Sequence, residues 1–547
     1  MLPYAPATEL ETHEVTNQPP PLVDINLYET DLALREGVRR EAGDWLDQRA
    51  LALGAVVGSE AVLALGAEVN RHPPELDAFD RYGRRLDEVR FHPGYHQLMA
   101  LAMEHRIHDL AWTEQGLDAH LAHAVLLALF TQAEAGTMCP INMTYAAVPA
   151  LRSAPEVGAP WLGKLIGGRY DAALKPLADK AGVTLGMAMT EKQGGSDVRA
   201  NTTRAEALGE GLYRLIGHKW FCSAPMSDGF LTLAYAAGGL TCFLLPRIAP
   251  DGGRNPLHLM RLKDKLGDRS NASAEIEYHG AIAWRIGEAG QGVKTIIEMV
   301  HHTRLGTISS TLGVMRRALM EAAHHVAGRT AFQKRLIDQP AMRAVIADLA
   351  LEYEAAAALV TRVARAFGDR DEGGRAFARL AVALAKFRLT KRCPDFVYEC
   401  MECHGGVGYV EETPLPRYYR QAPLNGIWEG SGNVIALDVL RTLAREPLAL
   451  QAYAEALAET KGAHPALDRA ADDLIHDLAG AAPAEADARR TVERMALVLQ
   501  ASLLARHAPG ALADGFIRSR LLNEGGRCYG ALPSGVDPAP MLARQTI

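Results

Sequence analysis

One carboxylate lies in a glycine-rich loop that suits acid–base chemistry. The segment LNGIWEGSGNVIALDVL, residues 424–440, places Glu429 between the apolar pair Ile427 and Trp428 and the small residue Gly430. A carboxylate partly desolvated against an indole ring has a raised pKa, which suits a general base. Glu429 is therefore a candidate base, although the spacing alone fits an exposed loop acid equally well.

A second segment, MAMTEKQGGSDV at residues 187–198, combines hydroxyls with glycines. A predicted strand ends at Met189 or Thr190, and the turn that follows carries Gly194, Gly195 and Ser196. Backbone N–H groups in such a turn can bind a polar ring or a phosphate. A plain hairpin turn explains the same letters and is the more common outcome.

A third segment, GHKWFCSAP at residues 217–225, places two aromatic residues together on a predicted strand. Successive side chains on a strand point to opposite faces. We therefore expect one ring, Trp220 or Phe221, to pack in the core and the other to be free to stack on a planar ligand. Cys222 and Ser223 follow on the same strand.

The segment CMECHGGVGY, residues 400–409, contains the Cys-x-x-Cys-His spacing of a c-type haem attachment site. The seven cysteines are scattered, and the first residues show neither a basic nor an apolar signal region. We therefore expect the protein to lie in the cytoplasm, a compartment in which covalent haem attachment does not normally occur. No metal site is expected, and Cys400 is expected to pack in the core.

The chain that must position these segments has 547 residues, 48% of them hydrophobic, and a net charge of −7. Its length predicts roughly three to four units with sizeable cores. The mildly acidic balance gives no whole-chain reason to expect nucleic-acid binding. The apolar runs are too short or too interrupted to cross a bilayer.

Apolar periodicity predicts an α+β fold. Spacings of three and four indicate helices in residues 1–180, apart from a charged, proline-containing connector at residues 70–97. Short apolar runs in residues 181–290 predict an antiparallel sheet or barrel. Long helices are predicted again in residues 291–446, and an additional helical tail in residues 447–547.

Taken together, these segments resemble the acyl-CoA dehydrogenase family of flavoproteins. The likeness covers about residues 30–445 and includes MTEKQGGSD, KDKLGDRSNASAEIEY, CHGGVGY and IWEGSGNV. It implies FAD as the cofactor and an N-terminal helical domain, a central β domain and a C-terminal helical bundle. In such enzymes a carboxylate removes the α proton of an acyl-CoA while a hydride passes from the β carbon to flavin N5.

The resemblance assigns a role to individual residues. Glu429 is the implied base, and Thr303 lies where some relatives place the base instead. Trp428 replaces a usual tyrosine and can narrow the acyl pocket. The implied substrate-binding residues are Thr190, Ser196 and Arg304. The implied flavin-binding residues of the same subunit are Met189, Thr190, Gly195, Ser196, Phe221, Cys222, Ser223, Trp428, Gly430, Ser431 and Asn433.

Other residues would contact the FAD of a neighbouring subunit. By the same resemblance these are Arg329, Phe332, Glu402, Gly405 and Gly406, and Cys403 can approach the cofactor from the same segment. A flavin site shared between chains requires an oligomer, so a homotetramer is expected.

The tail raises a second hypothesis. The resemblance extends to an adaptive-response branch of the family with a helical tail, which implies binding of double-stranded DNA and protection against DNA alkylation. Residues 447–547 hold ten Lys and Arg against twelve Asp and Glu, however, whereas DNA binding needs a basic surface. Arg518, Arg520 and Arg527 are the candidate DNA contacts. The alternative is an ordinary dehydrogenase of short or branched acyl-CoA (isovaleryl-CoA-type) with a purely structural tail.

Overall fold

The N-terminal block is helical because its apolar residues recur at helical spacing on its outer helices, whereas its central helices are apolar and buried on nearly all sides. The computed structural model describes residues 6–480 and 482–545. Gly43, at a φ of 78°, separates the first two helices, and the Ser59 hydroxyl caps the third. The helices are α1 (Leu32–Glu41), α2 (Asp44–Val57), α3 (Glu60–Arg71), α4 (Pro93–Glu104), α5 (Leu110–Thr113), α6 (Ala119–Ala133), α7 (Met138–Ala146), α8 (Val148–Arg152) and α9 (Pro155–Leu165).

The predicted connector at residues 70–97 holds a β-hairpin, so that prediction is corrected. Strand β1 (Glu75–Phe79) pairs antiparallel with β2 (Arg85–Arg90). Charged side chains pair across the two strands, as Arg90 does with Glu75 at 2.7 Å. Such pairs stabilise a hairpin without the apolar alternation by which strands are recognised in a sequence.

The central block is a seven-stranded sheet. Six of its strands coincide with the predicted apolar runs, whereas β4 was missed because most of its side chains are exposed. The strands are β3 (Leu185–Ala188), β4 (Arg204–Gly209), β5 (Leu212–Ser223), β6 (Gly229–Ala236), β7 (Gly239–Pro246), β8 (Leu257–Leu262) and β9 (Ser273–Ile286).

The sheet closes on itself into a barrel. Strand β6 pairs with β7, β7 with β9, β9 with β5, β5 with β4, and β4 returns to β6. This closed circuit encloses an apolar interior that includes Phe230, Phe243 and Ile276, and β3 and β8 each pair with a single strand beside it. The sheet is mixed rather than purely antiparallel, since β3 and β4 both run parallel to β6.

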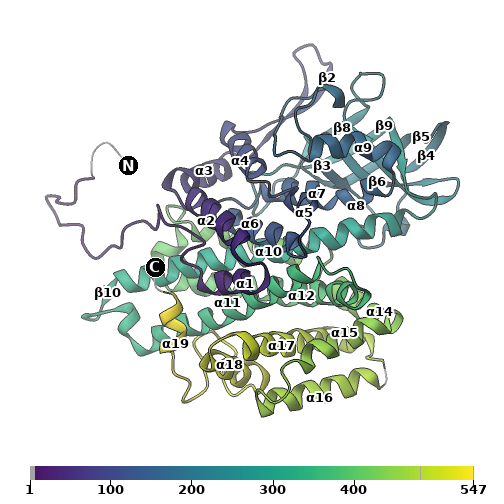
Figure 1. Cartoon of the computed structure of the whole chain (residues 1–547). Coiled ribbons are helices and arrows are strands. Elements are labelled where there is room, and N and C mark those ends of the chain that lie inside the picture. The colour runs from purple at the N-terminus through teal and green to yellow at the C-terminus, as the bar shows by residue number, and fades with distance from the viewer. Residues whose placement is uncertain (1–5, 481, 546–547) are drawn as a thin grey trace.

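Long helices cross the molecule beneath the barrel and the N-terminal block (Figure 1). Helix α10 contacts α6 and α7 on one side and α11 and α12 on the other. A two-stranded hairpin, β10 (Thr330–Ala331) with β11 (Lys334–Arg335), follows α10. The helices are α10 (Gly292–Gly328), α11 (Pro340–Ala366), α12 (Glu372–Glu402), α13 (Leu415–Gln421) and α14 (Gly432–Arg445).

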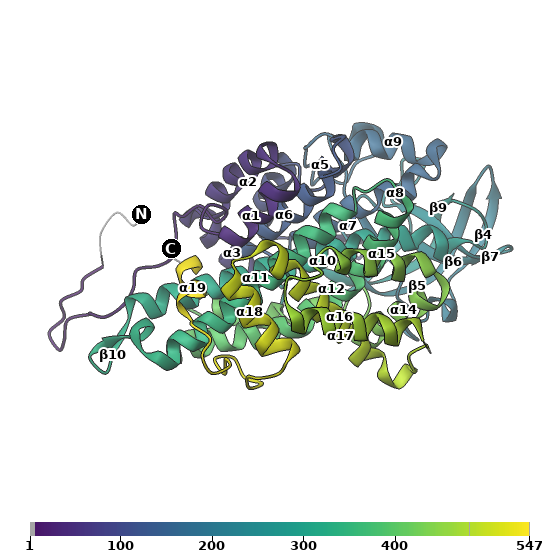
Figure 2. The same cartoon turned by 60° about the horizontal axis from the view of Figure 1, so that its bottom comes forward.

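The tail forms a further helical layer against α11, α12 and α14, which comes forward in Figure 2. Its helices share one continuous apolar core with the N- and C-terminal blocks. They are α15 (Pro447–Ala458), α16 (Pro465–Ala479), α17 (Ala488–His507), α18 (Gly510–Phe516) and α19 (Ala539–Leu542).

Among the described residues, no single helix has the length and apolarity needed to cross a membrane. The pair α2 and α3 passes that test together, with a 65° bend between the helices.

Candidate active site

The loop between α13 and α14 presents Glu429 in an unusual backbone conformation. Its φ is 56°, in the left-handed region that costs free energy for a residue with a side chain. The Thr303 hydroxyl donates a hydrogen bond to the Glu429 carboxylate at 2.7 Å. The Lys386 ammonium donates to the Gly430 carbonyl at 2.7 Å and to the Asn425 carbonyl at 3.1 Å. Helices α10 and α12 thus hold the loop from both sides.

Burial controls the ionisation of this site. Desolvation raises the pKa of Glu429, while the Thr303 hydrogen bond and the charges of Lys386 and Arg304 oppose the rise. Desolvation also lowers the pKa of Lys386 to about 7, with Arg304 adding to the decrease. A carboxylate with a raised pKa is a stronger base in its ionised form. It is therefore suited to accept a proton from carbon.

Arg304 was predicted to bind substrate, and the structure corrects that role. Its guanidinium is buried and forms an ion pair with Asp438 at 2.7 Å. Its Nε also lies 3.3 Å from the Glu429 carbonyl, to which it donates. Arg304 is therefore committed to holding the loop in place.

Trp428 brings the loop to the junction of the three blocks. Its ring packs against the apolar cluster that contains Cys139 and Met143 of α7, and Met189, just after β3, packs against the same cluster. Its indole N–H donates to the Asn425 side chain at 2.9 Å. Cys139 lies near both Ser223 and Glu429, and burial raises the pKa of its thiol to about 12. Cys139 was missed, because a single cysteine in a helical segment carries no spacing signal.

The turn after β3 is held by a buried ion pair that was also missed. Glu191 and Lys219 are both fully buried, with Oε1 and Nζ 2.8 Å apart. Glu191 also accepts hydrogen bonds from the backbone N–H groups of Thr202 and Thr203. The pair makes the turn rigid, so the exposed Gly195 and Ser196 and the half-buried Met189 and Thr190 have fixed positions. A Cβ on Gly195 would lie 2.6 Å from the Thr190 hydroxyl.

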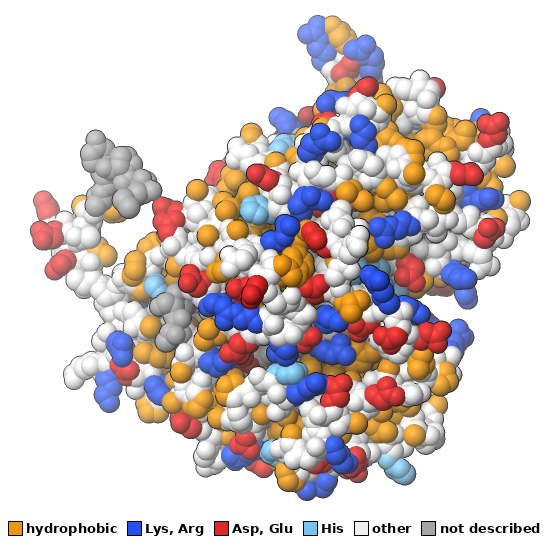
Figure 3. Space-filling model, in the orientation of Figure 1, with side chains coloured by type: hydrophobic (Ala, Val, Ile, Leu, Met, Phe, Trp, Pro, Cys, Tyr) orange, Lys and Arg blue, Asp and Glu red, His pale blue; other side chains and the backbone are white. Residues whose placement is uncertain are grey.

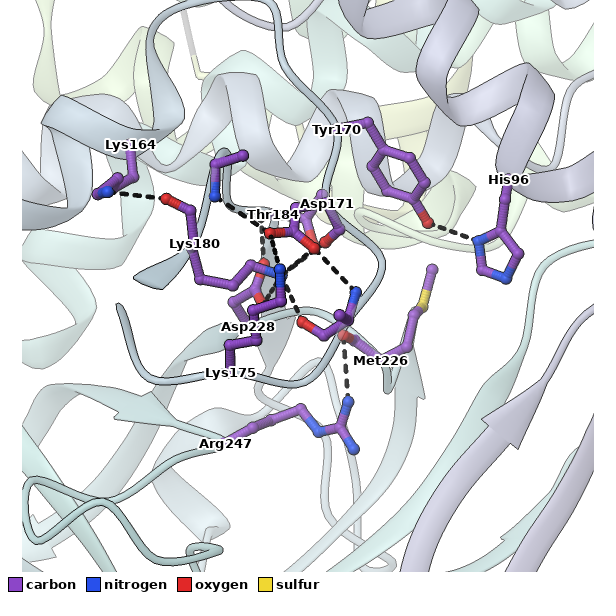
Figure 4. A network of polar contacts seen from close by, with 12 residues as sticks. His96, Lys164, Tyr170, Asp171, Lys175, Lys180, Thr184, Met226, Asp228 and Arg247 are labelled. Carbon is purple, nitrogen blue, oxygen red and sulfur yellow. Dashed lines mark hydrogen bonds and ion pairs between the residues drawn. The ribbon is translucent and has the colours of Figure 1, made fainter. Parts of the chain in front are cut away.

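A polar network fixes the other end of β3 (Figure 4). Lys180 is buried and pairs with Asp228 at 2.9 Å. Asp228 in turn accepts a hydrogen bond from the backbone of Thr184, just before β3, at 2.9 Å. Every polar group of this Lys180–Asp228 contact has a structural partner, so the network positions the strand and leaves no reactive group.

Neither Trp220 nor Phe221 packs in the core, which corrects the prediction that one would. The register of β5 on β9 shifts between Lys219 and Cys222, so this stretch of β5 is bulged. Phe221 is 54% exposed, and the half-buried Trp220 ring stacks against the Lys263 ammonium 3.4 Å from the ring centroid. The Cys222 side chain is fully buried in the apolar cluster of the barrel, so it offers no thiol at the surface.

Residues Ser431 and Asn433 stand at the start of α14, immediately after Glu429, and both are exposed. Gly430 has a φ of 102° and completes the sharp turn before the helix. Ser431 thus ends the loop of the candidate base, and Asn433 lies in the first turn of the helix that follows.

The residues expected to serve a neighbouring subunit lie far from Glu429. Twenty-six residues separate Thr303 from Arg329, about 39 Å at 1.5 Å per helical residue. Phe332 is 91% exposed at the tip of the β10–β11 hairpin, with a φ of 52°. Glu402, Gly405 and Gly406 are also exposed, and a Cβ on either glycine would contact nothing.

The Cys-x-x-Cys-His segment is packed within the protein. Cys400 is fully buried, as expected, and Cys403 is buried too, which corrects its proposed approach to a cofactor. Burial raises the pKa of the Cys403 thiol to about 12. The His404 ring bonds the Cys400 carbonyl at 2.9 Å and stacks on His325. These side chains are occupied by internal contacts rather than arranged around a haem.

The three arginines assigned to DNA do not form a basic cluster. Arg520 is largely buried and pairs with Asp348 and Glu352 of α11. Arg518 pairs with Glu524 at 2.7 Å, and only Arg527 is exposed without such a partner among the described residues. Figure 3 shows acidic and basic side chains interspersed over the visible face of the tail. Burial and pairing with two acids speak against the predicted DNA contact of Arg520, whereas the predicted contacts of Arg518 and Arg527 stay predictions.

Comparison with known proteins shows the family to which the chain belongs. Three family models match: the adaptive response protein AidB N-terminal domain at residues 17–172, and the middle and C-terminal domains of acyl-CoA dehydrogenase at residues 186–281 and 290–444. AidB of Escherichia coli (strain K12) is 45% identical over 94% of this chain and 96% of its own length. The chain belongs to the acyl-CoA dehydrogenase family. The predicted family resemblance and fold are thereby confirmed.

A further relative and a solved structure are also similar to this chain. Acyl-CoA dehydrogenase family member 11 of Caenorhabditis elegans is 32% identical over 73% of this chain and 67% of its own length. The solved structure of ACDH-11 from that organism, in complex with C11-CoA, has a TM-score of 0.85 at 26% identity and covers 99% of this chain and 93% of its own. Membership makes this chain an FAD-dependent oxidoreductase.

Proposed function

We propose that the protein oxidises an acyl-CoA thioester between its α and β carbons, with Glu429 as the base that removes the α proton. The observation that carries the proposal is the placement of Glu429. This half-buried carboxylate has a raised pKa, a strained backbone and a hydrogen bond from Thr303, and it lies where the three blocks meet. Strain and a shifted pKa at one residue are typical of active sites.

The residues that the family resemblance assigns to the flavin have the chemistry that a flavin requires. The exposed Phe221 ring and the hydroxyls of Thr190 and Ser223 offer a flat apolar surface with polar groups at its edge. Gly195 keeps the turn beside Thr190 tight, since a Cβ there would collide with the Thr190 side chain. Bound FAD would supply the acceptor for the hydride that leaves the β carbon.

The chain itself supplies proton transfer and orientation. Glu429 takes the α proton, and its backbone N–H is the donor that we assign to the thioester carbonyl, where negative charge develops. Lys386 and Arg304 hold the loop through its carbonyl groups, so the carboxylate is preorganised. Trp428 forms one wall beside the base and limits the acyl group that can enter.

A homotetramer is proposed as the working form. Arg329 and Phe332 are too distant from Glu429 to serve the same flavin, and Phe332 has almost no contacts within its own chain. An exposed aromatic side chain on a rigid hairpin tip is suited to complete a site on another subunit.

A role in the response to DNA alkylation rests on the likeness to the adaptive response protein alone, because the arginines assigned to DNA add nothing to it.

Anaerobic flavin reduction tests the proposal. We expect the purified protein to be yellow and to lose its flavin absorbance when mixed with one or more members of a panel of straight and branched acyl-CoAs. Glu429→Gln should retain the flavin and reduce the rate by at least about a hundredfold, since a general base contributes roughly 10²–10⁴. A Glu429→Gln protein that reduces its flavin at the wild-type rate would remove Glu429 from the reaction.

A further inference from the structure

Three side chains of the kinds that bind transition metals meet beside the β1–β2 hairpin. Glu68 lies near the end of α3, His72 is the C-cap of that helix, and His92 is the N-cap of α4. One ligand atom from each residue lies within 4.8 Å of the ligand atoms of the other two. It is the only group of this kind in residues 6–480 and 482–545.

Glu68 and His72 are one helical turn apart and already share a contact. Nδ1 of His72 lies 3.1 Å from the Glu68 carbonyl and 3.2 Å from Oε1 of the Glu68 carboxylate. The other carboxylate oxygen, Oε2, lies 4.0 Å from the Arg71 guanidinium. A proton on Nδ1 that is donated to the carbonyl leaves Nε2 of the same ring with its lone pair, and a neutral ring held in this way is the form that binds a metal.

The two imidazole rings have the separation that a shared metal requires. The ring centroids of His72 and His92 are 5.3 Å apart, and the ring planes are inclined by 22°. Two imidazoles on one tetrahedral ion, with Zn–N bonds of about 2.0–2.1 Å, have centroids about 5.2 Å apart. Nδ1 of His92 accepts a hydrogen bond from the backbone N–H of Gly94 at 3.2 Å. A metal on this ring would therefore take the place of one long cap bond.

The three side chains are open to solvent, so an ion can reach them. The side chains of His72 and Glu68 are 57% and 42% exposed, and His92 is half-buried. Two imidazoles and one carboxylate are a ligand set that suits Zn²⁺ and leaves its fourth position for water. Mg²⁺ and Ca²⁺ prefer oxygen ligands, so this set does not suit them.

An exposed pair of Glu68 and His72 contributes little to stability by itself, and such a pair does not require a second histidine beside it. The ligand types, the ring separation and the open side chains together point to an ion. We propose that Glu68, His72 and His92 bind one Zn²⁺ ion.

The bound ion would close the base of the β1–β2 hairpin. The hairpin occupies the chain between His72 and His92, and α3 and α4 lie side by side (Figure 1). At the other end of the hairpin, the Asp87 carboxylate accepts a hydrogen bond from the backbone N–H of Leu259 in β8 at 2.8 Å. An ion that links α3 to α4 would thus hold the hairpin in place between the N-terminal block and the barrel.

Zinc titration of the flavin-loaded protein, after treatment with a chelator, tests the proposal. Every protein in the test carries Cys528→Ser, because an exposed thiol is itself a zinc ligand. Competition against a chromophoric chelator should give one bound Zn²⁺ per chain. Zn²⁺ should also raise Tm saturably, because a ligand that binds only the folded state stabilises it. Mg²⁺ at the same ionic strength should not.

Two variants each remove one ligand. His72→Asn and His92→Asn should each weaken Zn²⁺ binding at least about tenfold, since losing a group that only orients a ligand already costs this much. Asn at position 92 can still cap α4, so the start of the helix is kept. His279→Asn is the matched control, because His279 stacks on His258 beside Glu277 but lies outside the proposed site. Zinc binding should be unchanged in this control.

X-ray absorption at the zinc edge identifies the ligands directly. We expect two imidazoles and only nitrogen or oxygen neighbours at about 2.0–2.1 Å. A sulfur neighbour at about 2.3 Å would place the ion on a cysteine and overturn the proposal. Zinc affinity that is equal in the parent protein, His72→Asn and His92→Asn would also overturn it, as would an equal rise of Tm with Mg²⁺ or the absence of stoichiometric zinc binding.

Discussion

At the scale of single residues, the ionisation of Glu429 depends on groups that are distant in sequence. The residues next to Glu429 in the sequence predicted desolvation by Trp428, and burial does raise the pKa of Glu429. The opposing groups are not visible locally, since Thr303 lies 126 positions away and Arg304 lies 125 positions away. Arg304 was for this reason misassigned to substrate, because a sequence shows the charge but not the ion pair with Asp438.

Thr303→Val should shift the pH dependence of flavin reduction. The hydroxyl stabilises the carboxylate form of Glu429, so its loss raises the pKa of Glu429 further. The reaction needs the carboxylate, so the half-maximal rate should move to higher pH. Stopped-flow reduction between mildly acidic and alkaline pH measures this shift.

Thr307→Val is the matched control for that experiment. Its hydroxyl bonds only the Thr303 carbonyl within α10, at 2.9 Å. A pH profile that moves equally in both variants, or in neither, would contradict the role assigned to Thr303.

The raised pKa of Glu429 also affects stability. The contribution of Glu429 to the free energy of unfolding falls as the pH rises from the pKa of this residue in the unfolded chain to its higher pKa in the folded protein.

At the scale of elements, periodicity predicted the buried segments and missed the polar ones. The long helices α10, α11 and α12 and six strands of the barrel were visible because their apolar residues recur regularly. The β1–β2 hairpin and β4 were missed, since most of their side chains are partly or fully exposed. The shift in register on β5 explains why Phe221 is exposed, and a register shift depends on the partner strand.

Phe332→Ala tests the β10–β11 hairpin. The ring is almost wholly exposed, so its removal should leave the unfolding of an isolated chain nearly unchanged. If the hairpin completes the flavin site of another subunit, the variant should lose flavin or dissociate. Absorbance per chain and light scattering measure these two effects.

Tyr82→Ala is the control for Phe332→Ala, because it removes an exposed aromatic side chain from a different hairpin. Tyr82 is 68% exposed on the β1–β2 hairpin, which has no assigned role in the flavin site. Full flavin content and an unchanged oligomer in Phe332→Ala would remove the hairpin from the shared site.

At the scale of the whole molecule, the tail is part of the fold. Its helices share the main core, and Arg520 and Arg544 connect it by ion pairs to α11. The charge balance of the tail gave a reason to doubt DNA binding. The cluster of arginines was nevertheless misjudged, because acids of α11 neutralise Arg520 from more than 160 positions away.

Arg520→Gln should therefore act on stability. Removing one partner of a largely buried ion pair leaves Asp348 and Glu352 undercompensated, at a cost of about 3 kcal/mol in the free energy of unfolding. Arg527→Gln, at an exposed position, should cost almost nothing. Urea unfolding compares them. Equal stabilities, together with a steep, salt-dependent loss of DNA affinity in Arg520→Gln, would restore the DNA hypothesis.

The central claim is that Glu429 removes the α proton of an acyl-CoA, and solvent exchange tests it most directly. The flavin-loaded protein is incubated anaerobically in D₂O with an acyl-CoA that it binds, and deuterium at the α carbon is followed by mass spectrometry. The wild-type protein should incorporate deuterium there, and Glu429→Gln with full flavin should not. Equal incorporation by the two proteins, or none in the wild type while its flavin is reduced, would contradict the assignment.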